Sequence, residues 1–214
     1  MPDLFGLAAI ITKFLLYLGV ITATGTVMAA LVFKLDRTRG LAATFAALGL
    51  FATILSFSLR GANLTGDVSG MTDPMMLNLL WSTPVGTALA LRVVGLSLLL
   101  VGLFLGHIGA WASVLGGLIA LFSFTQIGHI SGSEAAFMKI TLMLHLLAIA
   151  LWIGVLTPLN RLVSTSTTHV SAADVGHRFG LVASVTVPLL IVVGGYMGYQ
   201  LVGSFTALVE TNYG

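Results

Sequence analysis

The sequence predicts an all-α protein, a polytopic transmembrane bundle of about six helices. Of its 214 residues, 57% are hydrophobic and only 7% are charged, whereas roughly 25% of the residues in a soluble domain are charged. The apolar residues form continuous runs, such as Val93–Leu105 and Leu142–Leu156, and not the alternating pattern of a barrel strand. A bilayer is crossed by about 20 helical residues. We therefore expect residues 1–214 to form a single transmembrane domain.

The expected helices follow the apolar runs in order along the chain. We place them at residues 7–33, 41–59, 86–105, 111–128, 136–157 and 179–203. The first run is too long for the hydrophobic region of a signal peptide, and Asp3 stands where a signal would carry basic residues, so we expect a retained helix. Residues 106–110 form a glycine-punctuated turn between the third and fourth helices.

The basic residues indicate how the helices are oriented. Connections 34–40 and 158–178 carry lysine and arginine, whereas connections 60–85 and 129–135 carry acidic residues and a single arginine. The positive-inside rule places the first two in the cytoplasm, together with the turn at 106–110. The N-terminus, the C-terminus and the 60–85 segment then face outward, and the cell inner membrane is the expected location.

The outward 60–85 segment has two halves of different composition. It is rich in glycine, aspartate and threonine up to Pro74 and then becomes apolar through Trp81. A proline that follows a capping aspartate is typical of a helix start. We expect a short interfacial helix here, with Asp73 as its cap.

A short internal repeat links two distant parts of the chain. Residues 79–86 resemble residues 207–214, and both segments follow an apolar helix and end in Thr-x-x-Gly. The spacing corresponds to a four-helix repeat whose second copy is truncated. The prediction is that the chain either ends in mid-repeat at Gly214 or lacks further helices.

Several function classes lack support in the sequence. There is no cysteine, which excludes disulfides and thiolate metal sites. The formal net charge is +2 without a large basic cluster, so a nucleic-acid partner is not expected. No nucleophile triad, HExxH helix, phosphate loop or dinucleotide fingerprint occurs, and the protein is not expected to be an enzyme.

Two histidines are the strongest candidates for chemistry. His129 ends the fourth expected helix, and His145 lies about two and a half turns inside the fifth. An imidazole buried in lipid is costly unless it is hydrogen-bonded or binds a ligand, so the pair predicts a ligand or transport site. We expect both rings in the outer half of the membrane, on adjacent helices and facing the bundle interior. The alternative is a neutral histidine bonded to serine or threonine. The remaining histidines, which we interpret as surface residues, are His107, His169 and His177.

Methionines add soft ligands on the same outer side. Met71, Met75 and Met76 lie in the 60–85 segment, and Met138 precedes His145 by seven residues, on nearly the same helix face. Thioether and imidazole ligands together suit copper, especially its reduced ion. The alternative is that these methionines are apolar filler.

Two basic residues lie about two turns inside their expected helices. A charge near the bilayer centre costs roughly 2.5–3.5 kcal/mol on insertion scales, so we expect Lys13 and Arg92 to need partners. The external acids available to them are Asp67, Asp73 and Glu134. Lys139 lies close enough to a helix end to snorkel.

Several of these strings resemble the copper resistance protein D family. They are Gly128-His129, the stretch from His145 through Trp152 and Gly154, Thr83-Pro-Val-Gly86 followed by Arg92, His177-Arg178-Phe179, and Leu201–Leu208 with Thr211–Gly214. The resemblance implies an inner-membrane protein, usually of eight helices, that moves copper from the periplasm to the cytoplasm beside a small periplasmic copper-binding partner. It places the family's histidines on His129 and His145. Because nothing follows Gly214, the last two helices of the family are expected to be missing.

Three functions follow from these observations. The first is copper handling, in which copper is captured near the external methionines and passed to His129 and His145. The second is a structural or assembly subunit of a larger membrane complex, such as an oxidase, monooxygenase or photosynthetic complex. The third is haem or quinone electron transfer, which is disfavoured because the two histidines differ in depth by about nine residues, or some 13 Å at 1.5 Å per residue.

Overall fold

The computed structural model describes residues 4–127, 135–164 and 169–202, and most of these residues are helical. The α-helices are α1 (Leu4–Phe33), α2 (Arg39–Thr65), α3 (Pro74–Trp81), α4 (Pro84–Gly102), α5 (Gly106–Phe122), α6 (Ala135–Ser164) and α7 (His169–Val202), with short 3-10 helices η1 (Val68–Met71) and η2 (Ser123–Gln126). Six helices in the described ranges are long and apolar enough to cross a membrane. The expected all-α transmembrane class is confirmed.

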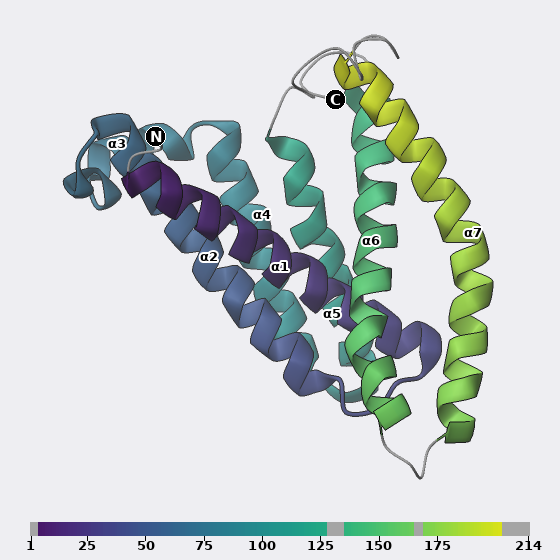
Figure 1. Cartoon of the computed structure of the whole chain (residues 1–214). Coiled ribbons are helices and arrows are strands. Elements are labelled where there is room, and N and C mark those ends of the chain that lie inside the picture. Colours follow the sequence, from purple (N-terminus) through teal and green to yellow (C-terminus); the bar gives the residue numbers. More distant parts are fainter. Residues whose placement is uncertain (1–3, 128–134, 165–168, 203–214) are drawn as a thin grey trace.

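Helix α1 lies in the middle of the bundle. It packs against α2, α5 and α6, while α4 pairs with α5 and α2 (Figure 1). The outermost helix is α7, which packs against α6 and touches α1 at few positions. The start of α1, helix α3 and the start of α6 share one end of the bundle. The end of α1 and the starts of α2, α5 and α7 share the other (Figure 1), as six crossings require.

Helices α1 and α6 cross at two glycines. A Cβ atom added to Gly25 would overlap the backbone of Ala150, and one added to Gly154 would overlap the backbone of Gly25. Small residues of this kind let helix backbones approach closely, which is a main source of helix association in lipid. The crossing therefore attaches the α6–α7 pair to the rest of the bundle.

Several helix boundaries differ from expectation, including the end of α6, which lies at Ser164 and not at residue 157. The turn between α4 and α5 is formed by residues 103–105, because Gly106 begins α5 with a φ of +65°. The end of α2 extends beyond residue 59 to Thr65, where Gly66 caps it with a φ of +73°. Helix α7 begins at His169 and not at residue 179. The apolar run underestimates α7 because its first two turns are polar and lie near the end of the bundle.

The short interfacial helix is confirmed as α3. The Oδ1 atom of Asp73 accepts a hydrogen bond of 2.8 Å from the backbone N–H of Met75, and Pro74 occupies the first turn. Leu80 is buried, whereas Met75, Leu79 and Trp81 are exposed. The helix therefore lies against the bundle by one face, at the end where α2 finishes and α4 starts.

Removal of the α3 cap is expected to loosen this helix alone. Asp73→Ala deletes the acceptor for the Met75 N–H, which costs about 1 kcal/mol at a helix N-terminus. Hydrogen exchange of the α3 amides should accelerate by roughly fivefold, the factor that this free energy corresponds to. Asp36→Ala, at an exposed aspartate at the other end of the bundle, is the matched control. Equal protection of α3 in both variants would contradict the capping role.

Candidate functional site

The interface between α6 and α7 contains the intramembrane histidine. Three contacts define it, in order from the start of α6. Phe137 meets Tyr196 edge-on at 5.2 Å between ring centroids, and Trp152 meets Phe179 edge-on at 5.4 Å. The Nε1–H of Trp152 also donates a 2.9 Å hydrogen bond to Oγ1 of Thr186. We call this contact surface the α6–α7 seam.

His145 lies in the seam between these contacts. It follows Phe137 by eight residues and precedes Trp152 by seven, so all three share one face of α6. Opposite the ring is Gly194 of α7, where an added Cβ atom would lie 4.0 Å from Cε1 of His145 and would meet nothing else within that distance. No side chain therefore projects from α7 at Gly194 against the imidazole.

The ring of His145 has an unused nitrogen. Its Nδ1 atom is buried and has no hydrogen-bond partner among the described residues. The expected alternative, a histidine bonded to serine or threonine, therefore finds no support at Nδ1. A buried polar atom without a partner is costly, and a neutral imidazole nitrogen is a common metal ligand. This arrangement fits a nitrogen that is kept available for a ligand.

The other candidate metal ligands do not gather around His145 as closely as the sequence suggests. Met138 is half-buried and lies one heptad before His145. Within the described residues, no group of three or more histidine, cysteine or acidic side chains gathers closely enough to hold a metal ion. A copper ion at His145 would therefore rely on few ligands, with sulfur from methionine as the available complement.

His129 lies outside the described residues, so the facing pair of histidines stays a prediction. The structure does correct one assumption behind it, that sequential helices α5 and α6 pack side by side. These helices make little contact, and α6 packs instead on α1. His145 points toward α7 and not toward α5, because the glycine crossing orients α6 with its small residues against α1.

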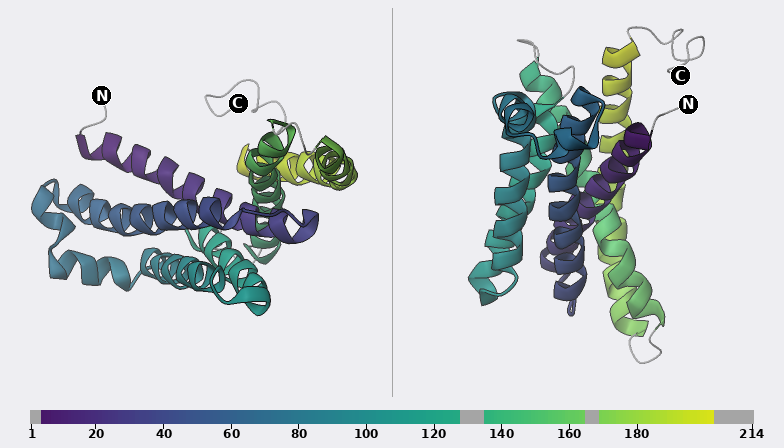
Figure 2. Two further views of the ribbon diagram at one scale, coloured as in Figure 1. Left: turned by 90° about the horizontal axis from the view of Figure 1, so that it is seen from below. Right: turned by 90° about the vertical axis from the view of Figure 1, so that its left-hand side faces the viewer.

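The external methionines lie on the other side of the bundle. Met71 ends η1, and Met75 and Met76 lie in the first turn of α3; Met75 is exposed, whereas Met71 and Met76 are half-buried. Helix α3 packs on α2 and α4 and lies far from α6 and α7 (Figures 1 and 2). The structure does not bring these methionines and His145 together, so a direct transfer between them is not built into the described bundle.

Arg92 forms a second polar centre, between α4 and α5. Its Nε–H donates a 2.8 Å hydrogen bond to Oγ of Ser123, and its guanidinium lies 4.8 Å from the centre of the Phe124 ring. The Tyr17 ring stacks on Phe124 at 4.5 Å. Arg92 is buried, and the expected acidic partners are replaced by a hydroxyl and an aromatic face.

The sequence did not reveal the partners of Arg92. Ser123 and Phe124 begin η2, directly after α5, so their depth matches that of Arg92, but depth alone does not show which face they occupy. Lys13, which we also expected to need a partner, is exposed on α1 and is accounted for by snorkelling. Lys139 is half-buried near the start of α6.

The structure partly corrects the expectation for the remaining histidines. His107 lies in the first turn of α5 and His169 is the first residue of α7, and the described part of the chain does not include their side chains. His177 is exposed, as expected for a surface residue, but it lies within α7 and not in a loop.

Comparison with known proteins adds one decisive finding. The sequence profile of the family described as Copper resistance protein D-like, N-terminal domain, matches residues 1–140. The chain belongs to this family. No curated protein and no solved structure matches the chain significantly. The resemblance to the copper resistance protein D family is therefore confirmed over α1 to the start of α6, and the chain is a multi-pass membrane protein of that family.

Proposed function

We propose that this copper resistance protein D-like chain is a non-enzymatic copper carrier of the inner membrane, which takes copper from the periplasmic side. The observation that carries the proposal is the buried Nδ1 of His145, which has no partner among the described residues. Family membership points to copper, and imidazole with thioether sulfur is a ligand set that copper favours. In this proposal copper is the cargo, and His145 with Met138 provides a transient intramembrane site.

The α6–α7 seam supplies the physical setting for such a site. Gly194 itself presents no side chain to the ring, and the aromatic contacts of Phe137 and Trp152 cover the seam on either side of His145. His129 is proposed as the outer member of the relay, and a small periplasmic copper-binding protein as the donor. Because the external methionines lie over α2 and α4, their proposed role is capture of copper at the surface and not direct hand-over.

His145→Ala is expected to reduce copper accumulation by cells that express the protein, and to weaken Cu(I) binding by the purified protein at least about tenfold. Even the loss of a residue that only supports a metal ligand costs 10- to 100-fold in affinity. His145→Met should retain more binding than His145→Ala because it restores a soft ligand.

His177→Ala is the matched control, since His177 is exposed near the opposite end of the seam. Copper accumulation by His145→Ala cells equal to that of the His177→Ala control, at equal protein level, would overturn the proposal. His129→Ala is expected to behave like His145→Ala.

A second candidate function is favoured by the exposure of α7. Only 6% of its most apolar window is buried, compared with 61% for α1, so α7 offers far more surface than α1 to lipid or another protein. This observation favours the alternative of a subunit within a larger membrane complex. Purification in mild detergent separates the two functions: stable co-purification with an oxidase, monooxygenase or photosynthetic complex supports the subunit, and a monomer that binds copper alone supports the carrier.

A further inference from the structure

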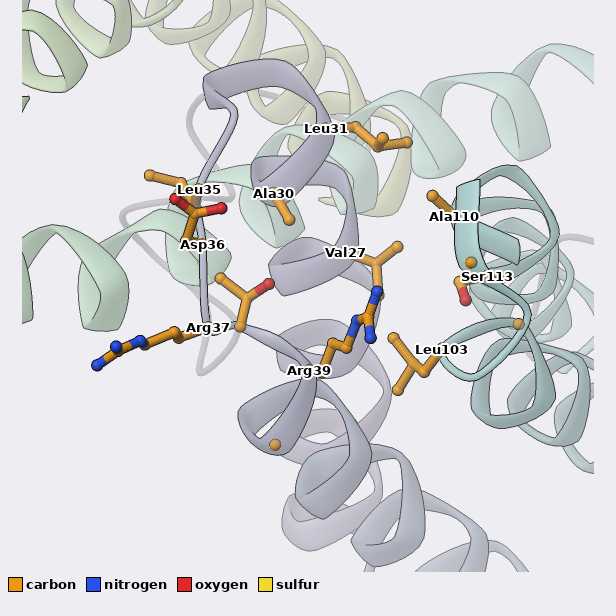
Figure 3. Close-up of a pocket in the computed structure, with 14 residues that line it drawn as sticks. Val27, Ala30, Leu31, Leu35, Asp36, Arg37, Arg39, Leu103, Ala110 and Ser113 are labelled. Carbon is orange, nitrogen blue, oxygen red and sulfur yellow. The ribbon is translucent and has the colours of Figure 1, made fainter. Parts of the chain in front are cut away.

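An open pocket of about 640 Å³ lies at the basic end of the bundle. It is formed by the end of α1, the start of α2 and the turn between α4 and α5 (Figure 3). Its inner wall is apolar and includes Val27, Leu31, Leu103 and Ala110, while Thr38 and Arg39 supply polar groups. The pocket therefore combines an apolar surface with a cationic rim.

Of the two arginines that line this pocket, Arg39 is the one whose side chain turns into it. Its side chain turns toward Val27 and Leu103, whereas that of Arg37 extends away from them (Figure 3). Asp36 also lines the pocket. Within the described residues, however, the ion pair that forms is the one between Arg178 and Asp174 of α7, and Asp36 makes none with Arg39. The guanidinium of Arg39 is thus free to pair with an anion from outside the chain.

Thr38 provides a second, independent polar group. It is only 9% exposed and lines the pocket, yet its side chain makes no capping hydrogen bond to α2. The first backbone N–H groups of a helix also lack intrahelical partners, and the first two residues of α2, Arg39 and Gly40, line the pocket. A hydroxyl that makes no capping bond, free helix N–H groups and a guanidinium together form a receptor for a phosphate oxygen.

We propose that this pocket binds an anionic phospholipid, with the lipid phosphate at Thr38 and Arg39 and an acyl chain against the apolar wall. A free phosphate ion would use the polar groups but not the side chains of Val27, Leu31 and Leu103. The basic residues of this end, which include Lys34 and Arg37, add attraction for an anionic leaflet. The proposal does not depend on copper.

Native mass spectrometry of the full chain in detergent tests the proposal with phosphatidylglycerol as the probe. Arg39→Gln is expected to weaken phosphatidylglycerol binding about fivefold, the effect of removing one arginine from an anionic membrane contact. Arg60→Gln is the matched control, because Arg60 is an exposed arginine at the other end of the same helix. Equal losses in the two variants would overturn the proposal.

Gly40→Asp separates binding from folding. A Cβ atom at Gly40 would meet nothing within 4 Å, and an acidic residue in the first turn of α2 interacts favourably with the helix dipole. The variant should therefore keep its Tm while its negative charge at the pocket weakens phosphatidylglycerol binding at least as much as Arg39→Gln does. Unchanged lipid binding with an unchanged Tm would overturn the proposal.

Competition identifies the source of the phosphate. Phosphatidylcholine, which has no net charge, should bind more weakly than phosphatidylglycerol to the wild-type chain, and inorganic phosphate at the same concentration should not displace phosphatidylglycerol. Displacement by inorganic phosphate would overturn the lipid assignment, because the apolar wall would then contribute nothing.

Discussion

Gly154→Leu is expected to destabilise the protein by roughly 3 kcal/mol or more. The new side chain would start where the backbone of Gly25 already lies, and neither backbone can move without separating α1 from α6. Overpacking of a well-packed core costs typically about 1–3 kcal/mol, and more where the obstacle cannot yield. Thermal unfolding in detergent, followed by loss of helical signal or by aggregation, measures the effect.

Gly195→Leu provides the control for this substitution. Gly195 lies in the apolar part of α7, and a Cβ atom there would meet nothing within 4 Å. The same leucine is therefore expected to leave the Tm nearly unchanged. If the two variants melted at the same temperature, the close crossing of α1 and α6 would be refuted.

Ser123→Ala is expected to cost about 2 kcal/mol, because hydrogen bonds to charged groups contribute about 1.5–3 kcal/mol. The substitution leaves Nε of the buried Arg92 without its acceptor. In an Arg92→Met background the same substitution should cost well under about 1 kcal/mol, since Ser123 then retains only its local 2.6 Å bond to the carbonyl of Ala120. Unfolding of the two single variants and the double variant measures this coupling.

Ser113→Ala is the matched control for that cycle. Its Oγ donates a 2.9 Å hydrogen bond to the carbonyl of Leu99, also between α4 and α5, and no charge is involved. The free energy of unfolding lost in Ser113→Ala should be the same with arginine or methionine at position 92. If the stability lost in Ser123→Ala were also the same with arginine and with methionine at position 92, the hydrogen bond from Arg92 to Ser123 would contribute nothing to stability.

The sequence predicts the elements of this fold well for a physical reason. Long apolar runs specify membrane helices directly because backbone groups in lipid must be satisfied within the helix. Asp73 followed by Pro74 specifies the start of α3 through a local hydrogen bond. Both signals are confined to a few neighbouring residues, so they can be read without knowledge of the tertiary structure.

The packing of the helices cannot be read in the same way. In a membrane helix the lipid-facing and protein-facing sides are both apolar, so periodicity does not distinguish them. The expected contact between α5 and α6 was wrong for this reason, and the partner of α6 is determined by the glycines at positions 25 and 154. His145 could be proposed from its type and depth, but its orientation toward Gly194 depends on that packing.

The central position of α1 has a consequence for how the chain is made. About a hundred residues separate the end of α1 from the start of α6. Helix α1 is therefore synthesised and inserted in the bilayer well before α6, its packing partner, has been made. During that interval Gly25 and the adjoining threonines face lipid or the insertion machinery. The bundle therefore closes late in synthesis.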